Sequence, residues 1–443
     1  MHTSARLLAP GLLSLIALVA AGCGGTARLP LEGGTGPHPQ LPPPDKSLIP
    51  VLHIAPAKGW PSGGKPVPGP GLTVTAFATG LDHPRWLYVL PNGDVLVAET
   101  NAPAKPEDGK GLRGWVQKKV MMRAGSITPS ADRITLLRDE QGSGVAGQRF
   151  VFAEKLHSPY GMALVGTQFY VANSDAVVSF HYVEGEPRVQ GPPTKVVDLP
   201  AGPINHHWTK NVVASEDGSR LYATVGSNSN AGENGLAAEE GRAAVWEIVP
   251  ATGEHRIYAA GLRNPNGLAW VAATGKLWAV VNERDELGSD LVPDYMTALV
   301  DGGFYGFPFS YYGSHVDTRV KEPQPALVAK AIVPDYALGA HTASLGLVYD
   351  RGQPGRSSGP FSEGMFVGQH GSWNRKPFSG YRVVFVPFKD GWPAGEPIEV
   401  LTGFLNDKGE AQGRPVGVAL DKHGGLLVAD DVGNAIWRVT PAP

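Results

Sequence analysis

Short apolar runs separated by polar turns recur from about residue 72 to the end of the chain. Each repeat begins with a turn that contains proline or glycine and continues with a short apolar run. A polar turn such as Asn-Gly or Asp-Gly then leads into a second apolar run, an order typical of a β-hairpin. Six repeats can be distinguished, at residues 80–100, 156–182, 204–227, 261–283, 343–388 and 413–441.

The six repeats predict an all-β fold, a six-bladed β-propeller. A hairpin cannot bury both of its faces alone, so repeated hairpins favour radial packing around a shared axis, and a β-sandwich fits less well. No apolar period of 3.6 residues extends over a helical length, apart from a short turn around 233–242. The strand at 72–79 has no hairpin partner of its own. We therefore expect this N-terminal strand to pair with the last blade and close the ring.

Composition supports this interpretation and excludes one class of partner. The chain has 58 Gly and 40 Pro among 443 residues, and 18% of its residues are charged, which is typical of many short strands and turns. The formal net charge of -3 provides no basic surface for nucleic acid. The propeller domain is expected at 71–443, with loops in its longest stretches between repeats, at 101–150, 284–340 and 389–412.

The N-terminus has the pattern of an export signal. Residues 1–22 contain Arg6 followed by an apolar run that is too short to span a membrane. Cys23, the one cysteine of the chain, follows Ala-Ala-Gly, as in a bacterial lipoprotein signal. We expect Cys23 to be lipidated and the protein to be attached to a membrane in the periplasm or at the cell surface. An ordinary secretory signal with an incidental cysteine is the alternative.

Residues 23–70 are rich in proline and glycine, which exclude a helix or a central strand. They are expected to form an extended tether that holds the propeller away from the membrane surface. A remnant of maturation without a role is the alternative.

Histidine or arginine stands at the opening of every repeat. In a propeller these openings surround one mouth of the central channel, where such side chains could hold an anion and a proton acceptor together. In the alternative interpretation, the X-Pro steps only set the blade entries and the side chains are solvated. The openings are His83-Pro84-Arg85, His157-Ser158-Pro159, His206-His207-Trp208, Arg263-Asn264-Pro265-Asn266, His341-Thr342 and Arg414-Pro415.

Several strings resemble one known family. GLRNPNGLAW at 261–270 is similar to the GxRNPxGLA signature of soluble quinoprotein glucose dehydrogenases and aldose sugar dehydrogenases. INHHWTK at 204–210 resembles the histidine segment of that family, and GLDHPRWLYVLPNGDVLVAE at 80–99 resembles the first blade of its sorbosone dehydrogenase branch. RPVGVALDKHGGLLVADD at 414–431 resembles the last blade. The chain is thus similar to the glucose/sorbosone dehydrogenase family over about 72–441.

This resemblance implies oxidation of a sugar aldehyde or an aldose with pyrroloquinoline quinone (PQQ) and Ca²⁺. His207 matches the base that takes the hydroxyl proton, and Arg263 matches the arginine beside the reactive quinone oxygen. A periplasmic cytochrome or a membrane quinone is the expected electron acceptor. The residues expected to bind the cofactor are Arg263, Asn264, His206, His341, Thr342, His370, Arg375 and Arg414.

The expected calcium loop departs from the family pattern ExGPxGDE. The Gly-Pro whose carbonyls hold the ion is replaced by Asp285-Glu286, so carboxylates would join or replace the main-chain ligands. A solvated acidic loop is the alternative. The expected ligands are Glu283, Asp285, Glu286 and Asp290.

Two cofactor segments also depart from the pattern. The family's Arg-x-Arg pair is reduced to Arg414-Pro415-Val416. Its fifth-blade lysine is missing from GQHGSWNR, where His370 or Arg375 would substitute.

Two other functions stay open on sequence grounds. Six-bladed propellers also include calcium-dependent lactonases and esterases, which would require Asp, Glu and Asn at the repeat openings in place of the His and Arg found here. A non-catalytic propeller that binds carbohydrate or a protein partner is the other possibility.

Overall fold

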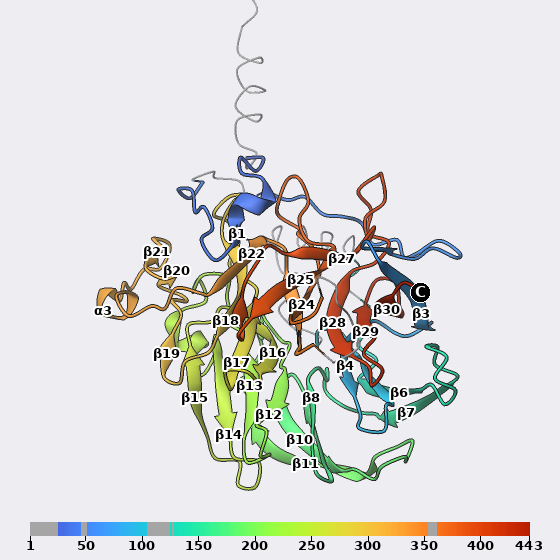
Figure 1. The fold of residues 1–443 in the computed structure, drawn as a ribbon. Coiled ribbons are helices and arrows are strands. Elements are labelled where there is room, and N and C mark those ends of the chain that lie inside the picture. Colours follow the sequence, from blue (N-terminus) through green and yellow to red (C-terminus); the bar gives the residue numbers. More distant parts are fainter. Residues whose placement is uncertain (1–24, 46–50, 104–124, 126–127, 353–360) are drawn as a thin grey trace, which may run out of the picture.

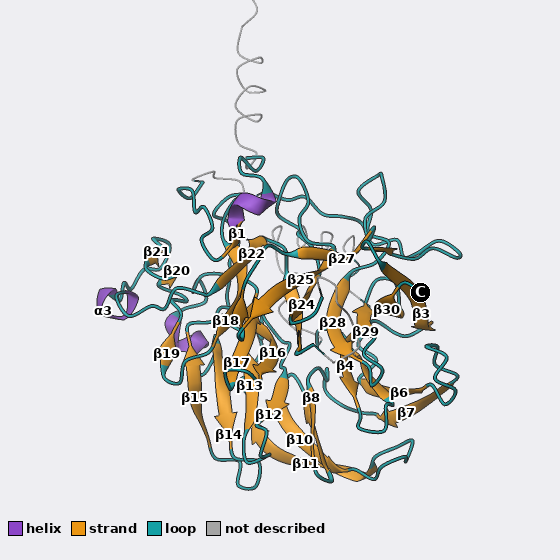
Figure 2. Ribbon diagram, viewed as in Figure 1, coloured by secondary structure: helices purple, strands orange, loops and turns teal. Residues whose placement is uncertain are grey.

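The computed structural model describes residues 25–45, 51–103, 125, 128–352 and 361–443. Their strands form six sheets around a common centre (Figure 1), and helix is confined to short turns (Figure 2). The all-β, six-bladed propeller predicted from the repeats is confirmed. The expected signal peptide and Cys23 lie outside the described residues.

The first three blades follow one another along the chain, each a sheet that begins at its innermost strand and is antiparallel except for one added parallel strand in blade 3. Blade 1 contains β4 (Pro84–Val89), β5 (Val95–Glu99), β6 (Arg133–Arg138) and β7 (Gln148–Ala153). Blade 2 contains β8 (Met162–Val165), β9 (Gln168–Ala172), β10 (Ala176–His181) and β11 (Gln190–Asp198). Blade 3 contains β12 (Val212–Ala214), β13 (Leu221–Val225), β14 (Ala244–Ile248), β15 (His255–Ala260) and the added β19 (Gly303–Phe304).

The last three blades each include a strand from the N-terminal part of the chain. Blade 4 contains β16 (Pro265–Val271), β17 (Lys276–Val281), β18 (Pro293–Ala298), β22 (Tyr336–Ala340) and β1 (Thr35–Gly36). Blade 5 contains β23 (Ser344–Asp350), β24 (Gly364–Gln369), β25 (Arg382–Lys389), β27 (Ile398–Thr402) and β2 (Val67–Pro68), and β26 (Trp392–Pro393) also pairs with β25. Blade 6 contains β28 (Pro415–Leu420), β29 (Leu426–Asp430), β30 (Ala435–Pro441) and β3 (Leu72–Thr79).

The remaining elements are small and lie outside the blades. A two-stranded hairpin contains β20 (Ser310–Tyr311) and β21 (His315–Val316). The helical turns are η1 (Leu31–Gly34), η2 (Leu236–Glu239) and α3 (Pro325–Val328). The turn η2 lies where the sequence allowed a short helical turn.

The ring is closed as predicted. Strand β3, from residues 72–79, pairs antiparallel with β30, the third strand of the last blade. The innermost strands β4, β8, β12, β16, β23 and β28 contact one another in sequence order, and β28 contacts β4. Strand β3, which precedes the first blade in the sequence, is thus the outer strand of the last blade, and its pairing with β30 joins the two ends of the propeller non-covalently.

Hydrophobic packing between blades explains the continuous apolar runs of the repeats. Six clusters of buried side chains fill the gaps between consecutive blades among the described residues. Strands β5, β13 and β24 are buried along their whole length, because each has a neighbouring blade on both faces.

The stretches expected to be loops supply the outer strands of the blades. Strands β6 and β7 fall largely in 101–150, β18 and β22 in 284–340, and β27 in 389–412. Strands β18 and β22 are fully buried, whereas β7 and β11 have mostly exposed or half-buried positions. The sequences of β7 and β11 therefore carry little hydrophobic pattern.

The segment expected to be a free tether packs along the propeller. Strand β1 pairs with β22 and β2 pairs with β27, so the segment lies beside blades 4 and 5 at the upper edge of the view in Figure 1. Main-chain groups of a proline-rich chain can still pair with strand edges and loops, which is how this segment binds. The expectation of a tether that holds the body at a distance is corrected for residues 25–45 and 51–70. No helix among the described residues is long and apolar enough to cross a membrane.

Candidate functional site

The openings with His83, Arg263 and Arg414 directly precede innermost strands, whereas His157 is exposed, pairs with Asp175 at 2.8 Å and belongs to neither group described below. His83 is one residue before β4, Arg263 two before β16, and Arg414 one before β28. Since these strands surround the axis, their preceding residues meet at one end of the channel. Two groups of polar side chains result, one centred on Asp431 and one on Asp285.

The Asp431 cluster joins blades 1, 5 and 6. One carboxylate oxygen of Asp431 lies 2.7 Å from Nη1 of Arg85, 2.9 Å from Nε2 of His370 and 3.6 Å from Nε2 of His83. The Asp431 main-chain N–H donates to the Arg414 oxygen. The guanidinium of Arg85 also lies over the ring of Trp208, 5.8 Å from its centroid, next to His207 in the chain.

Burial determines the charge of this cluster. Burial would raise the pKa of Asp431, but the neighbouring histidines and Arg85 hold it far below its ordinary value. Burial lowers the pKa of His370 to about 4 and also lowers that of His83, against the opposing effect of Asp431. At neutral pH the histidines are therefore neutral, and among the described residues Arg85 is the arginine that pairs with Asp431, while the guanidinium of Arg414 lies over the ring of Tyr381.

Three buried polar atoms of the cluster have no hydrogen-bond partner among the described residues. They are Nε of Arg85, Nε of Arg414 and the second carboxylate oxygen of Asp431. Buried donors without partners are costly and rare. The unused guanidinium donors suit an anionic group such as a carboxylate.

His207 is held in a defined orientation by blade 3. Its Nδ1 lies 2.9 Å from both the main-chain oxygen and the hydroxyl of Ser227. That hydroxyl donates to the Ser229 oxygen, so both Ser227 oxygens act as acceptors and Nδ1 carries the hydrogen. In the neutral imidazole the lone pair is then on Nε2, as a base requires.

Ser227 also joins His207 to Arg263, because its N–H donates to the Arg263 main-chain oxygen. Between them Gly226 allows a close approach: a Cβ there would clash with both His207 and Asn264. The buried Oδ1 of Asn264 has no hydrogen-bond partner among the described residues. His207 and Asn264 thus lie together, as the sequence predicted.

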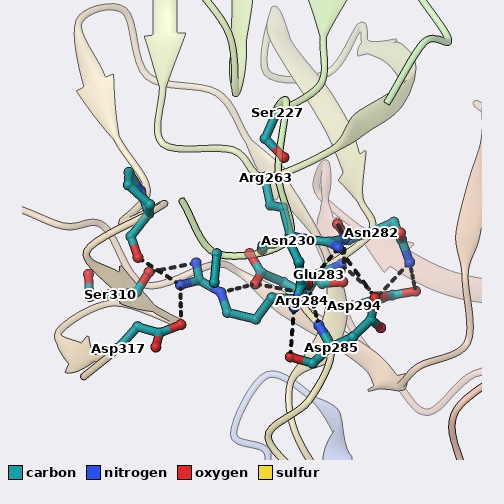
Figure 3. Close-up of polar contacts among 12 residues, drawn as sticks. Ser227, Asn230, Arg263, Asn282, Glu283, Arg284, Asp285, Asp294, Ser310 and Asp317 are labelled. Carbon is teal, nitrogen blue, oxygen red and sulfur yellow. Dashed lines mark hydrogen bonds and ion pairs between the residues drawn. The ribbon is translucent and has the colours of Figure 1, made fainter. Parts of the chain in front are cut away.

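The nitrogens of the Arg263 guanidinium all have partners within the protein. It donates to the main-chain oxygens of Asn230 (3.0 Å) and Glu283 (2.7 Å), and to Oδ1 of Asn230 (2.9 Å). It also forms an ion pair with Asp285 at 3.4 Å (Figure 3). All three of its nitrogens have protein partners, so Arg263 positions this loop and is not an unused donor for a cofactor. Its predicted role beside the quinone stays a prediction.

His341 and Thr342 belong to the same region. Nδ1 of His341 lies 3.4 Å from Asp285, and its Nε2 lies 2.8 Å from the Gly288 oxygen. The Thr342 hydroxyl donates to Asp294 at 3.1 Å. Burial raises the pKa of Asp294 to about 6. His341 and Thr342, which lie just before β23 of blade 5, therefore contact the loop that follows β17 and the start of β18.

The expected calcium ligands do not converge. The Glu283 carboxylate pairs with Arg284 at 2.9 Å, Asp285 is held as described, and the Asp290 carboxylate accepts main-chain N–H groups of Arg28 and Leu29. Glu286 is exposed. No group of three or more His, Cys, Asp or Glu within the part of the chain that the structure describes is placed to hold a metal ion.

Three other expected cofactor residues differ in their surroundings. Arg375 donates to the main-chain oxygens of Ser289, Pro377 and Leu29, so it fastens the N-terminal segment to two loops. His206 is exposed, and its N–H donates to Asn228. Arg414 donates to the Ala55 oxygen as well as lining the Asp431 cluster.

The sequence interpretation missed Arg85 and Asp431 as site residues. Arg85 was visible in the first repeat opening, two residues after His83, and Asp431 ends the last string that resembles the family. Arg319 and Asp317 gave no signal, since they lie in a stretch without repeat pattern.

Comparison with known proteins identifies related folds. The TrAA12-like family model matches residues 130–294 and 323–442. A calcium structure of the family AA12 carbohydrate-active enzyme of Trichoderma reesei has a TM-score of 0.67 and 17% identity, covering 89% of this chain and 100% of that one.

Two PQQ-containing structures share the fold. The holo PQQ domain of pyranose dehydrogenase from Coprinopsis cinerea has a TM-score of 0.66 and 20% identity, covering 88% of this chain and 100% of that one. The PQQ-bound aldose sugar dehydrogenase of Streptomyces coelicolor has a TM-score of 0.52 and 18% identity, covering 84% and 99%. The resemblance to sugar dehydrogenases inferred from the sequence is confirmed at the level of the fold.

Proposed function

The chain belongs to the TrAA12-like family, and on that premise we propose that it is a PQQ-dependent dehydrogenase that oxidises a sugar aldehyde or an aldose. It shares its fold with sugar dehydrogenases and AA12 oxidoreductases, which supports this proposal. We propose further that a periplasmic cytochrome or a quinone receives the electrons, and that a lipid on Cys23 attaches the protein to the membrane.

The Asp431 cluster is the observation that carries this proposal. Arg85 and Arg414 reach one end of the channel from different blades, and each has a buried Nε without a partner. PQQ bears three carboxylates, and guanidinium groups bind carboxylates strongly in such surroundings. Arg85 and Arg414 would hold a carboxylate of the cofactor at this end, whereas the one N–H of the neutral His370 is already directed at Asp431.

PQQ, when bound, supplies a two-electron acceptor for the hydride of the substrate carbinol. His207 would take the hydroxyl proton at Nε2, because Ser227 fixes the hydrogen on Nδ1. Asn264 would orient the substrate or cofactor through its buried amide oxygen, which lies beside His207. Arg263 would position both through Ser227 and the loop at 282–285.

A reconstitution assay tests this function. Purified apoprotein would be incubated with PQQ, then supplied with an artificial electron-accepting dye and a panel of aldoses and sugar aldehydes. We expect dye reduction that requires both PQQ and a sugar. Failure of every sugar in a sample that contains bound PQQ would favour a propeller that only binds ligands.

The variant His207→Ala separates the base from the binding site. Loss of a general base should lower turnover by about 10²- to 10⁴-fold, while the affinity for PQQ stays close to that of the wild type. His255→Ala is the matched control, because His255 is an exposed histidine on β15 of the same blade. Equal turnover in the His207 variant would contradict its assignment.

A further inference from the structure

Arginine side chains contact the loop that follows β17. Three arginines from different segments reach this loop and pair with three carboxylates, an arrangement that we call the arginine network (Figure 3 shows most of it). Its members are Arg263, Arg284, Arg319, Glu283, Asp285 and Asp317.

Arg284 forms the buried centre of this network. Its side chain is completely buried and lies 2.9 Å from Glu283 and 3.1 Å from Asp317. It also donates to the main-chain oxygens of Pro308 and Ser310. A buried guanidinium with this many acceptors is fully compensated, and removing it would leave the buried carboxylate of Glu283 without a guanidinium partner.

Arg319 forms a hydrogen bond to the main-chain oxygen of Asp285, the atom at which the family resemblance would place a calcium ion. Its Nη1 donates to the Asp285 oxygen at 2.8 Å, and the amide of Asn230 donates to the same atom at 3.2 Å. Residue 285 aligns with the glycine whose carbonyl, by the resemblance, holds calcium. Here both lone pairs of that oxygen are used by protein donors.

Arg319 also forms a bidentate pair with Asp317, from Nε to one oxygen (2.9 Å) and from Nη2 to the other (2.7 Å). Burial would raise the pKa of Asp317, but Arg319 and Arg284 outweigh burial and keep it below its ordinary value. Each carboxylate of the network thus has a guanidinium partner, and three positive charges balance three negative ones.

The nearby acidic groups are also engaged. The carboxylate of Asp294 accepts main-chain N–H groups of Glu283 and Ser344, and that of Asp290 accepts those of Arg28 and Leu29. A divalent cation needs oxygen ligands with uncompensated negative charge. These residues therefore do not fit the calcium ion that the family resemblance implies.

We propose that the arginine network replaces this calcium ion, so that the protein folds the loop and binds its cofactor without a divalent cation. Arg319 would take the position of the ion at the Asp285 oxygen, and Arg263 and Arg284 would supply the remaining positive charge. The part concerning the cofactor rests on the function proposed above, whereas the part concerning the loop does not.

Thermal unfolding of the wild-type protein tests the loop directly. Protein dialysed against EGTA would be heated in EGTA and in increasing CaCl₂, and its Tm measured by circular dichroism. We expect one Tm in all samples, and no calcium in the protein by elemental analysis. A Tm that rises and saturates with calcium, as for an ion that binds the native state, would overturn the proposal.

The variant Arg319→Ala tests whether the guanidinium of Arg319 replaces a calcium ion at the Asp285 oxygen. We expect a lower Tm in EGTA, part of which is restored by calcium because the Asp285 oxygen and Asp317 become available. Arg256→Ala is the control, since Arg256 also bridges two carboxylates, Glu247 and Asp301, but on the surface of blade 3. Equal behaviour of the two variants toward calcium would contradict the proposal. If Arg319→Ala does not fold, the wild-type titration decides alone.

A titration of PQQ in EGTA separates this inference from the proposed function. Binding of PQQ, followed by quenching of tryptophan fluorescence, should be equal in EGTA and in CaCl₂. Binding only in CaCl₂ would overturn the inference and leave the function intact. No binding in either buffer, together with a calcium-independent Tm, would overturn the function and support the account of the loop.

Discussion

Asp431 holds side chains from two other blades at one point. Its carboxylate is within hydrogen-bond reach of Arg85 and His370, and its second oxygen is buried without a partner in the described part of the chain. A buried carboxylate that is removed from water requires such compensation. We infer that Asp431 is the resident counterion of the channel and keeps Arg85 in place before an anionic ligand arrives.

The buried imidazole of His370 predicts a pH dependence of stability. Burial lowers its pKa to about 4 in the folded protein, against an ordinary value of 6.5. The unfolded chain binds the proton more readily between these values, so stability should fall as the pH drops from 6.5 to 4. The loss attributable to this group is on the order of 3 kcal/mol.

Urea unfolding at pH 7 and pH 4.5 measures this effect, with His370→Asn as the variant that lacks the group. We expect the difference in unfolding free energy between the two pH values to be smaller in the variant than in the wild type. His423→Asn is the control, because His423 is exposed in the turn before β29. A pH dependence that is identical in all three proteins would show that His370 does not titrate as described.

At the scale of elements, the inner hairpins were predictable and the outer strands were not. Strands such as β5 and β29 are buried on both faces, so their apolar runs stand out in the sequence. Strands such as β11 are mostly exposed, and they form because the neighbouring strand offers a free edge. The pairing of β3 with β30 could be predicted because ring closure requires a partner for an unpaired strand.

The docking of residues 25–70 could not be predicted from composition. Proline and glycine exclude regular structure, but they do not prevent contacts through main-chain carbonyls or isolated side chains. The N-terminal segment contributes acceptors to Arg375 and Arg414 and a donor from the partly buried Trp60. Two of the expected cofactor arginines therefore have a structural partner from outside the repeats.

Trp60 tests the docking of this segment. Its indole N–H donates to the buried carboxylate of Asp430 at 2.7 Å. Trp60→Phe keeps most of the ring but leaves this acceptor with one donor fewer, so it should cost about 1 to 3 kcal/mol of unfolding free energy. Trp392→Phe, at a partly exposed ring on β26, should cost less than about 0.5 kcal/mol. Equal urea midpoints for both variants would mean that the segment is not fastened through Trp60.

At the scale of the whole molecule, the propeller converts six separate openings into one site. The sequence indicated which residues open the repeats, and radial packing then brings His207 to Asn264 and Arg414 to His370. Radial packing alone did not predict the partners within the site. Arg319 reaches Asp285 from a stretch without repeat pattern. Two of the carboxylates expected to bind calcium, Glu283 and Asp285, are paired with arginines.

The central claim is that an anionic redox cofactor binds at the channel end lined by the Asp431 cluster. A crystal structure of the protein soaked with PQQ tests this most directly. We predict that a carboxylate of PQQ lies within hydrogen-bond distance of Arg85 and Arg414, with His207 on the side of the quinone oxygens. Density for PQQ elsewhere on the molecule, or an empty channel in crystals soaked at saturating PQQ, would contradict the account.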